Sequence, residues 1–438
     1  MSESVLPEVT ICWLRRDLRL EDHAALYHAL LSDNKVLPVF IFDPHILNQL
    51  PSRADRRVTF IHNTLYNLQA ELQHRGSALH VLYQTPVEAF KELQMVYRIK
   101  SVYTNHDYEP YALERDQQVA QFLRSQNIPF HTFKDQVIFE KDEVLKPDGK
   151  PYTVFTPYSK MWKARYQQHP PTSYNCAVHY SHLYQTAPIE IPSLSSMGFE
   201  PAEADIPSPE PDADIIRRYD ETRNIPGVEG TSKLSVHLRF GTVSVRSLVQ
   251  KAFQWNEQWL NELIWREFFM QIMYHFPYVA HKPFKSGYEQ IPWLNNEEAF
   301  AKWCAGETGY PLVDAGMRQL NQTGWMHNRV RMVTASFLIK HLLTDWRWGE
   351  AYFAEQLLDF DLAVNNGNWQ WVTGCGCDAA PYFRVFNPVE QQKKFDPDFV
   401  YIRRWIPEYK EGYIEPIVEH TFARNRVLEA FKVRDTFK

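Results

Sequence analysis

The chain has 438 residues, more than one hydrophobic core usually supports, so two domains are expected. Hydrophobic residues make up 44% of the chain and charged residues 23%, a balance that excludes a disordered protein. The formal net charge of -6 excludes an overall basic field, so any contact with nucleic acid must use a local basic patch.

The N-terminus and the cysteines constrain location and chemistry. The opening stretch MSESVLPEV lacks a basic segment followed by an apolar one, and the sequence holds no run of about 18 apolar residues. We therefore expect a cytoplasmic protein without a membrane contact. The cysteines are sparse, and only Cys375 and Cys377 lie close together, which predicts free thiols and no metal site.

Residues 1–135 alternate short apolar runs with amphipathic stretches. Strands are predicted at VTICWL, VLPVFIF, ALHVLY, SVYTN and IPFHTF, with helical segments from Asp22, near 57–75 and near 114–125. Strands separated by helices of this length form a parallel sheet through right-handed crossovers. The segment is therefore predicted to be an α/β, doubly wound domain. No glycine-rich phosphate motif follows these strands, which argues against a dinucleotide at the first turn.

The rest of the chain divides into a connector and a helical region. Pro, Ser, Glu and His dominate from about 165 to 212, so residues 136–214 are predicted to be an interdomain connector. Residues 215–438 have the apolar spacing of helices and are predicted to form an all-α domain.

Two helical segments carry polar and aromatic side chains on one face. In WLNELIWREFF, Glu262, Trp265 and Arg266 share a helix face, which also fits an amphipathic helix with a surface ion pair. In GWMHNRVRM, Asn328 and Met332 lie one turn apart, where a surface amide and a core methionine are the simpler interpretation. Neither segment alone decides between chemistry and packing.

Two further segments suit ligand recognition. In LLDFDLAVNNGNWQW, the Asn-Gly and Gly-Asn steps predict a turn, and an amide-rich aromatic loop suits recognition of flat heterocycles. In VEGTSKLS, hydroxyl and backbone N–H groups before a helix suit a phosphate. A plain capping role for Thr231 or Ser232 fits the same pattern equally well.

Together these segments resemble the photolyase/cryptochrome family over nearly the whole chain. The matches run in order from WLRRDLRLEDH through VFTPYSKMWK, VEGTSKLS, NELIWREF, TGYPLVDAGMRQL, GWMHNRVRM and NNGNWQW to DAAPYFRVFNP. The resemblance implies an N-terminal antenna domain and a helical domain that binds FAD, used as reduced FADH⁻. It also implies an antenna pigment without identifying it as methenyl-tetrahydrofolate, a deazaflavin or a second flavin. The stretch TNHDYEP resembles a folate-contacting region.

The family's motifs also imply particular roles. The residues that match the FAD pocket are Tyr219, Thr231, Ser232, Lys233, Leu234, Ser235, Trp259, Arg266, Trp325, Arg331, Asp359, Asp361 and Asn365. Asn365 matches the position beside flavin N5, where plant-type cryptochromes have an aspartate, so the asparagine favours repair. The family's electron relay falls on Trp369, Trp346 and Trp293, although three core tryptophans would give the same sequence pattern.

The resemblance also bears on the lesion. Family members that repair the (6-4) photoproduct carry histidines where Asn328 and Met332 stand, whereas Glu262, Trp265, Asn328, Met332 and Trp371 match the pattern of dimer repair. A monomeric lyase that acts on cyclobutane pyrimidine dimers in damaged DNA is therefore expected. Glu262 and Asn328 would face the flipped bases, and Trp265 and Trp371 would stack on them. An ionised carboxylate opposes an arriving negative charge, so Glu262 would need a proton or a bridging water.

DNA phosphates are expected to meet Arg223, Arg384 and Gln391. Lys393, Lys394, Arg403 and Arg404 fit the same role and fit solvated surface charges equally well. Three alternatives stay open. The first is a photosensory cryptochrome, which often carries a longer C-terminal extension; the second is a (6-4) photolyase; the third is a flavoprotein that stores FAD without contacting DNA.

Overall fold

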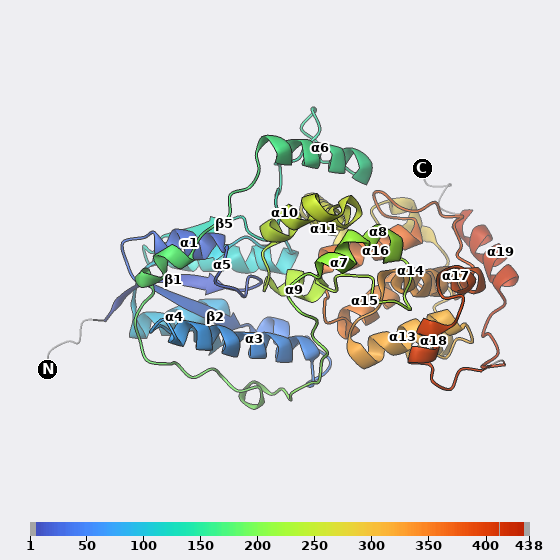
Figure 1. The fold of residues 1–438 in the computed structure, drawn as a ribbon, viewed down its shortest axis with the longest axis horizontal. Helices are drawn as coiled ribbons and strands as arrows, with labels where there is room; N and C mark the ends of the chain where they lie inside the picture. The colour runs from blue at the N-terminus through green and yellow to red at the C-terminus, as the bar shows by residue number, and fades with distance from the viewer. Residues whose placement is uncertain (1–5, 411, 433–438) are drawn as a thin grey trace. The chain divides into compact units, whose positions relative to one another are not determined.

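The computed structural model describes residues 6–410 and 412–432, which form two compact units (Figure 1). Unit 1 comprises Met1–Glu140, Tyr166–Pro209 and Leu234–Lys251, and unit 2 comprises Lys141–Arg165, Glu210–Lys233 and Ala252–Lys438. The segment 136–214, predicted to be a connector, thus contributes residues to both units.

A five-stranded parallel sheet forms the centre of unit 1 (Figure 1). The strands lie in the order β3-β2-β1-β4-β5, and the register places Trp13 beside Val39 on one side and Thr104 on the other. This arrangement confirms the predicted doubly wound domain. The strands are β1 Glu8–Leu14, β2 Val36–Phe42, β3 His80–Tyr83, β4 Arg98–Asn105 and β5 Phe130–Phe133.

The sheet of unit 1 is covered by helices on both faces, which is why β1 and β2 are almost continuously apolar. Ile11 and Trp13 pack in one cluster with Phe90 of α4 (Pro86–Val96) and Val119 of α5 (Pro110–Ser125). Helix α1 contacts β1, β4 and β5. The helices of this unit are α1 Ala24–Leu30, α2 Pro44–Leu47, α3 Arg56–Gln73, α4 Pro86–Val96, α5 Pro110–Ser125, η1 Ala177–His182, η2 Ser195–Met197 and α9 Ser235–Phe240.

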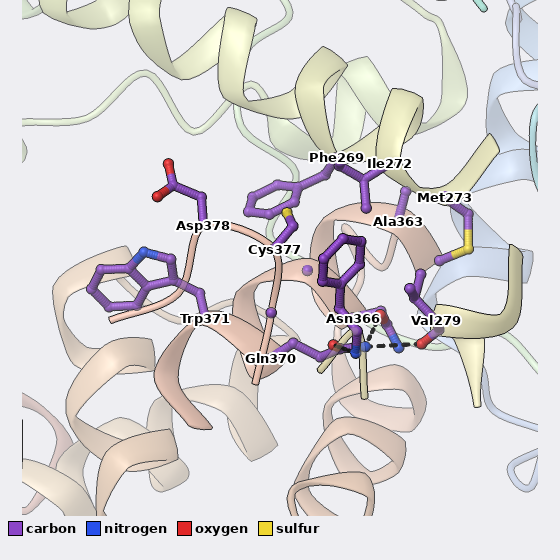
Figure 2. Close-up of a pocket in the computed structure, with 13 residues that line it drawn as sticks. Phe269, Ile272, Met273, Val279, Ala363, Asn366, Gln370, Trp371, Cys377 and Asp378 are labelled. Carbon is purple, nitrogen blue, oxygen red and sulfur yellow. Dashed lines mark hydrogen bonds between the residues drawn. The ribbon is translucent and has the colours of Figure 1, made fainter. Parts of the chain in front are cut away.

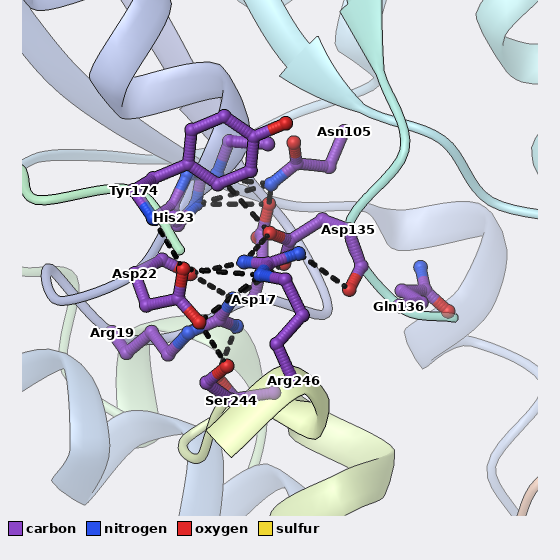
Figure 3. A network of polar contacts seen from close by, with 12 residues as sticks. Asp17, Arg19, Asp22, His23, Asn105, Asp135, Gln136, Tyr174, Ser244 and Arg246 are labelled. Carbon is purple, nitrogen blue, oxygen red and sulfur yellow. Dashed lines mark hydrogen bonds and ion pairs between the residues drawn. The ribbon is translucent and has the colours of Figure 1, made fainter. Parts of the chain in front are cut away.

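A buried polar network joins distant segments of unit 1 (Figure 3). The Asp135 carboxylate accepts hydrogen bonds from Arg19 at 2.7 Å and from Arg246 at 2.8 Å, and Arg246 also pairs with Asp22 at 3.0 Å. Burial alone would raise the pKa of Asp135, but Arg19 and Arg246 hold it well below its ordinary range. The network therefore consists of charged groups that depend on one another, because breaking a buried pair leaves an uncompensated charge.

Unit 2 is helical throughout the part that the structure describes, as predicted for residues 215–438. Helix α6 Phe155–Gln168 begins in unit 2 and ends in unit 1, and α10 Val245–Trp255 does the reverse. The other elements of unit 2 are α7 Ala213–Arg217, α8 Tyr219–Thr222, α11 Glu257–His275, η3 Pro277–Ala280, η4 Ser286–Gln290, α12 Glu297–Ala305, α13 Pro311–Thr323, α14 Asn328–Ser336, η5 Phe337–His341, α15 Trp346–Gln356, α16 Leu362–Thr373, α17 Pro388–Phe395, α18 Val400–Trp405 and α19 His420–Ala430.

Helices α11 and α16 pack against each other inside unit 2. Gly367 of α16 allows this approach, since a Cβ there would lie 2.2 Å from Cδ1 of Phe269 on α11. The turn predicted at the Asn-Gly step is therefore wrong. Asp361 caps α16 by accepting from the N–H of Val364 at 3.2 Å, and Asn365 and Gly367 lie within the helix. The glycine serves close helix packing rather than a turn.

Within residues 6–410 and 412–432, no helix has the length and apolar character needed to cross a bilayer. All five cysteines are free thiols. The same described residues contain no group of three or more His, Cys, Asp or Glu side chains arranged to hold a metal ion.

Candidate active site

The residues expected to hold FAD lie mostly in unit 2, where an ion pair ties two of its elements together. Arg331 of α14 pairs with Asp359 at 2.8 Å, just before α16, and its Nε donates to the carbonyl of Met326 at 2.8 Å. The Asp359 carboxylate is almost fully buried. The ammonium group of Lys233 lies 5.5 Å from the centre of the Trp325 ring. Four of the residues predicted to bind FAD are thus in contact with one another, two by two.

The remaining candidates for FAD binding are divided between the two units. Trp259 is buried near the start of α11 and Arg266 is half-buried on the same helix. Leu234 and Ser235 belong to unit 1. Helix α9 begins only at Ser235, with Leu234 as its N-cap residue and no side-chain cap, so the predicted capping role of Thr231 or Ser232 is wrong.

The amide of Asn365 has a partner that the sequence did not reveal. Its Nδ2 donates to Oε1 of Glu350 at 2.9 Å and to the Glu350 carbonyl at 3.2 Å. Burial raises the pKa of Glu350, and the bond from Asn365 lowers it in part. Glu350 lies on α15, a helix that contacts α16. The packing of α15 against α16 brings the Glu350 carboxylate to Asn365. No local sequence pattern indicates this contact.

These side chains fit a flavin dinucleotide. Hydroxyl groups, guanidinium groups and an ammonium group suit a diphosphate, and indole rings offer flat apolar surfaces to a ring system. The Asn365 amide has its N–H side engaged by Glu350, so its oxygen is available to a donor. The described residues that carry these groups are Thr231, Ser232, Lys233, Arg266, Trp325 and Arg331.

Tyr219, Arg223 and Glu262 form a chain of contacts between α8 and α11. The Arg223 guanidinium lies 5.4 Å from the Tyr219 ring centre and forms an ion pair with Glu262. Gln258 also donates to Oε1 of Glu262, at 3.0 Å. Burial raises the pKa of Tyr219, and Glu262 raises it further, whereas Arg223 lowers it. A cation therefore already accompanies the carboxylate that is expected to face the lesion.

Helix α14 begins at Asn328, which is exposed, and carries Met332 one turn later, half-buried. His327 is the N-cap residue, and its Nδ1 accepts from the N–H of Arg329 at 3.2 Å. Burial, together with the positive charges of Arg329 and Arg331, lowers the pKa of His327 to about 4. The imidazole that starts this helix is therefore neutral at neutral pH.

Three guanidinium groups adjoin the residues expected to meet the lesion. Arg223 pairs with Glu262, and the Arg384 guanidinium lies 5.8 Å from the Trp371 ring centre. Arg329, next to Asn328, donates to Oδ1 of Asn224 at 2.7 Å. Burial lowers the pKa of Arg329, with added repulsion from Arg223 and Arg384. Sequence reasoning missed Arg329, although it lies inside the GWMHNRVRM string.

The other residues predicted near DNA are four exposed cations and the half-buried Gln391. Lys393 is exposed and pairs with Glu390 at 2.8 Å, and Arg403 donates to the carbonyl of Asp398 at 3.4 Å. Arg404 donates to the Gly227 carbonyl at 3.3 Å. Lys394 lies 5.3 Å from the ring of Phe395, and Oε1 of Gln391 is buried without a hydrogen-bond partner. These contacts carry no direct indication of phosphate binding.

A small pocket opens between α11 and α16 (Figure 2). Trp371 is the one predicted lesion-binding residue in its lining, beside Cys377 and Asp378. The side-chain amide nitrogen of Asn366, which also lines it, is buried and unpartnered. Its oxygen accepts from Gln370 at 3.0 Å. The pocket is narrow and mainly apolar, so it does not represent a cavity for two joined bases.

The tryptophans of the expected relay occupy different environments. Trp369 is buried, with its ring centre 6.3 Å from that of Trp303 and 5.0 Å from that of Phe353. Trp346 is buried beneath the guanidinium of Arg347. Trp293 is half-buried, with Phe431 5.7 Å away. The order of electron transfer among these rings remains a prediction.

In unit 1, the stretch that resembles a folate-contacting region is engaged in bonds within the unit. Asn105 donates to Asp17 at 2.7 Å, and its oxygen accepts from the N–H of Ala25 at 3.0 Å. Glu109 pairs with Arg16 at 2.8 Å and with Arg239 at 2.7 Å. These polar groups hold the loops after the strands, and the antenna pigment stays unidentified.

Two protein-family models match segments of this chain. The model described as "DNA photolyase" matches residues 10–175, and the model described as "FAD binding domain of DNA photolyase" matches residues 259–412. A deoxyribodipyrimidine photo-lyase from Synechococcus sp. is 38% identical, with 94% of each chain covered. A bacterial class III photolyase from Agrobacterium tumefaciens has a TM-score of 0.87 at 31% identity, covering 100% of this chain and 99% of that one. A Synechocystis sp. cryptochrome has a TM-score of 0.83 at 25% identity, covering 98% and 100%.

Proposed function

Because this chain belongs to the DNA photolyase family and contains its FAD-binding domain, we propose that it repairs cyclobutane pyrimidine dimers in DNA in a light-driven reaction. The relatives named deoxyribodipyrimidine photo-lyase support this assignment. The enzyme is proposed to act as a monomer in the cytoplasm on damaged DNA. The antenna pigment is left open among a folate, a deazaflavin and a flavin.

Each predicted lesion-binding element has a guanidinium beside it, and this observation carries the proposal. Arg223 adjoins Glu262 on α11, Arg329 adjoins Asn328 on α14, and Arg384 adjoins Trp371 on α16. In a chain of net charge -6, three gathered guanidinium groups fit the phosphates on either side of an extruded nucleotide pair.

The side chains divide the work of recognition. Trp265 and Trp371 offer flat surfaces for stacking, and a damaged pair costs less to unstack than an intact one. Asn328 is exposed, so its amide is free to meet the carbonyl and imide edges of the bases. Met332 supplies a polarisable apolar contact one turn further along α14. When bound, reduced FAD supplies one electron to the dimer under blue light and takes it back.

Glu262 faces an electrostatic conflict that Arg223 eases. A lone ionised carboxylate would repel the negative charge on a base that gains an electron. The ion pair of Glu262 with Arg223 carries no net charge, so this repulsion is reduced. With the pair intact, Glu262 can orient a base edge through a water without adding net negative charge.

The deciding experiment is a repair assay. Purified protein with chemically reduced FAD is illuminated with an oligonucleotide that holds one thymine dimer, and restored thymines are measured by chromatography. We expect light-dependent repair of this substrate and none of a (6-4) photoproduct. Bound FAD with no repair of either lesion would exclude the proposal and favour a signalling role like that of cryptochromes.

A further inference from the structure

Trp265 of α11 is covered on one face by the ring of Phe155. The two ring centres lie 3.7 Å apart and the ring planes differ by 4°. Both side chains are half-buried. The Trp265 ring also meets Phe269, 5.4 Å away and tilted by 31°. The plane of the indole is therefore set by neighbouring rings before any ligand arrives.

Phe155 is bonded as well to the segment that follows α16. Its backbone N–H donates to Oδ2 of Asp378 at 2.8 Å. Phe155 is the first residue of α6, where backbone N–H groups lack partners within the helix and a carboxylate is favourable. Asp378 lies in the loop directly after α16, the helix that carries Trp371. One residue thus contacts Trp265 and, through Asp378, the loop beyond Trp371.

Helix α6 is itself fixed along α11. Nε1 of Trp162 donates to Oε1 of Glu267 at 2.5 Å, and both side chains are buried. One turn from Phe155, the Tyr158 ring lies 5.2 Å from that of Phe268. Phe155 therefore stacks on Trp265 from a helix that is anchored to α11 at its next two turns.

We propose that Phe155 is a positioning residue for lesion recognition, which sets the plane of Trp265 relative to Trp371 through its ring stack and its bond to Asp378. The inference rests on the proposed function, because Trp265 and Trp371 are there the two surfaces that meet the extruded bases. A pre-set indole loses no rotamer freedom on binding, so affinity for the lesion is higher than with a mobile one.

The first test compares Phe155→Leu with Phe155→Tyr. The leucine removes the stacked ring but keeps apolar bulk, whereas the tyrosine keeps the ring. For the leucine variant we expect about a threefold to tenfold loss in the ratio of affinities for a dimer-containing and an undamaged oligonucleotide, as for loss of one aromatic pair. The tyrosine variant should retain the ratio. FAD content and the thermal midpoint are measured in parallel, since a general structural defect lowers both.

A double-mutant cycle separates positioning from general packing. If Phe155 acts through Trp265, Phe155→Leu should have no further effect on the affinity ratio in a Trp265→Leu background. In a Trp371→Ala background, which leaves Trp265 in place, the effect of Phe155→Leu should persist. An undiminished effect in the Trp265→Leu background would overturn the proposal.

The bond to Asp378 gives a second, independent pair. Asp378→Asn keeps an oxygen acceptor for the N–H of Phe155 and should retain the affinity ratio, whereas Asp378→Ala should lower it. This pair decides the matter if Phe155→Leu does not fold. Selective dimer binding by the unchanged protein is the reference. Its absence would remove the proposed function, whereas selective binding that all four variants retain would remove only the role of Phe155.

Discussion

Asn365 of α16 and Glu350 of α15 hold each other in a fixed orientation. Nδ2 of Asn365 donates to Oε1 of Glu350 at 2.9 Å and to the Glu350 carbonyl at 3.2 Å, which leaves the amide oxygen of Asn365 for another donor. The sequence comparison with the family pointed to Asn365 alone. The carboxylate behind it holds the amide nitrogen, and would thereby set which end of that amide meets a flavin at the position that the resemblance implies.

We expect Glu350→Leu to destabilise the reduced flavin, because an unanchored Asn365 amide can present either end. Loss of one oriented hydrogen bond, worth about 1 kcal/mol, corresponds to about fivefold faster oxidation in air. The measurement is the return of oxidised-flavin absorbance in the dark. Glu350→Gln keeps an oxygen acceptor and serves as the control. Equal oxidation rates in the leucine and glutamine variants would contradict the role given to Glu350.

His327 should make stability depend on pH. Its pKa falls from 6.5 to about 4 on folding, so the folded state favours the neutral ring. The stabilisation is complete above pH 6.5 and is lost as the pH falls through 4, by about 3 kcal/mol in total at 1.36 kcal/mol per pKa unit. His327→Asn, a good N-cap that does not titrate, should flatten the decline in the free energy of unfolding between pH 7 and pH 4.5. Urea titrations give this slope, and identical slopes would refute the assignment.

Arg329 is expected to contact a DNA phosphate. Arg329→Gln should weaken binding to damaged and undamaged DNA alike and reduce the slope of log affinity against log salt by about 1. Lys393→Gln is a matched control, because Lys393 is exposed and already paired with Glu390. Its salt slope should change by less. If the salt slope changes more for Lys393→Gln than for Arg329→Gln, the DNA phosphates contact α17 instead of Arg329.

Trp371 and Glu262 should fail by different routes. Trp371→Ala removes a stacking surface and should lower affinity for the dimer about tenfold to a hundredfold, as expected for about 1–3 kcal/mol per stacked base. Glu262→Ala should lower the quantum yield of repair about fivefold with a smaller change in affinity. Binding titrations and yield measurements on the same oligonucleotide separate the two. Unchanged affinity and yield in both variants would refute the site.

Trp369 should matter for light-driven reduction of the flavin and not for repair by flavin that is already reduced. We expect Trp369→Phe to slow photoreduction at least tenfold in the presence of a thiol donor. Repair after chemical reduction should stay within about twofold of the unchanged protein, since phenylalanine preserves most of the packing. Normal photoreduction in Trp369→Phe would place the relay elsewhere, and the neighbouring Trp303 would be the next ring to replace.

Local patterns were enough to predict the sheet and the helical remainder. The apolar runs of β1 and β2 and the helix-period spacing beyond residue 215 are properties of short windows, and the structure confirms both. The turn predicted at Asn366 and Gly367 is wrong because that prediction, too, rests on a short window. A short window records turn-forming residues but not the ring of Phe269, which requires a glycine inside α16.

Site residues that lie in recognisable motifs could be predicted from the sequence. Residues whose proposed role depends on a contact in the folded chain could not. Glu262, Asn328 and Trp371 stand inside recognisable strings. Glu350 and Phe155 act on residues that are distant in sequence, through a helix contact and a ring stack. Phe155 does stand inside the string VFTPYSKMWK, but that string does not indicate which ring Phe155 stacks on, and nothing in the local sequence of Glu350 distinguishes it from an ordinary glutamate.

The buried charge network of unit 1 has a consequence for biosynthesis. Asp135 leaves the ribosome long before Arg246, one of the two guanidinium groups that neutralise it. A nascent chain that has just passed the last strand, β5, holds the Asp135 carboxylate before Arg246 has been translated. Unit 1 therefore reaches its final form only after the chain has been made well past residue 246, and a fragment that stops at residue 135 would lack what its own interior requires.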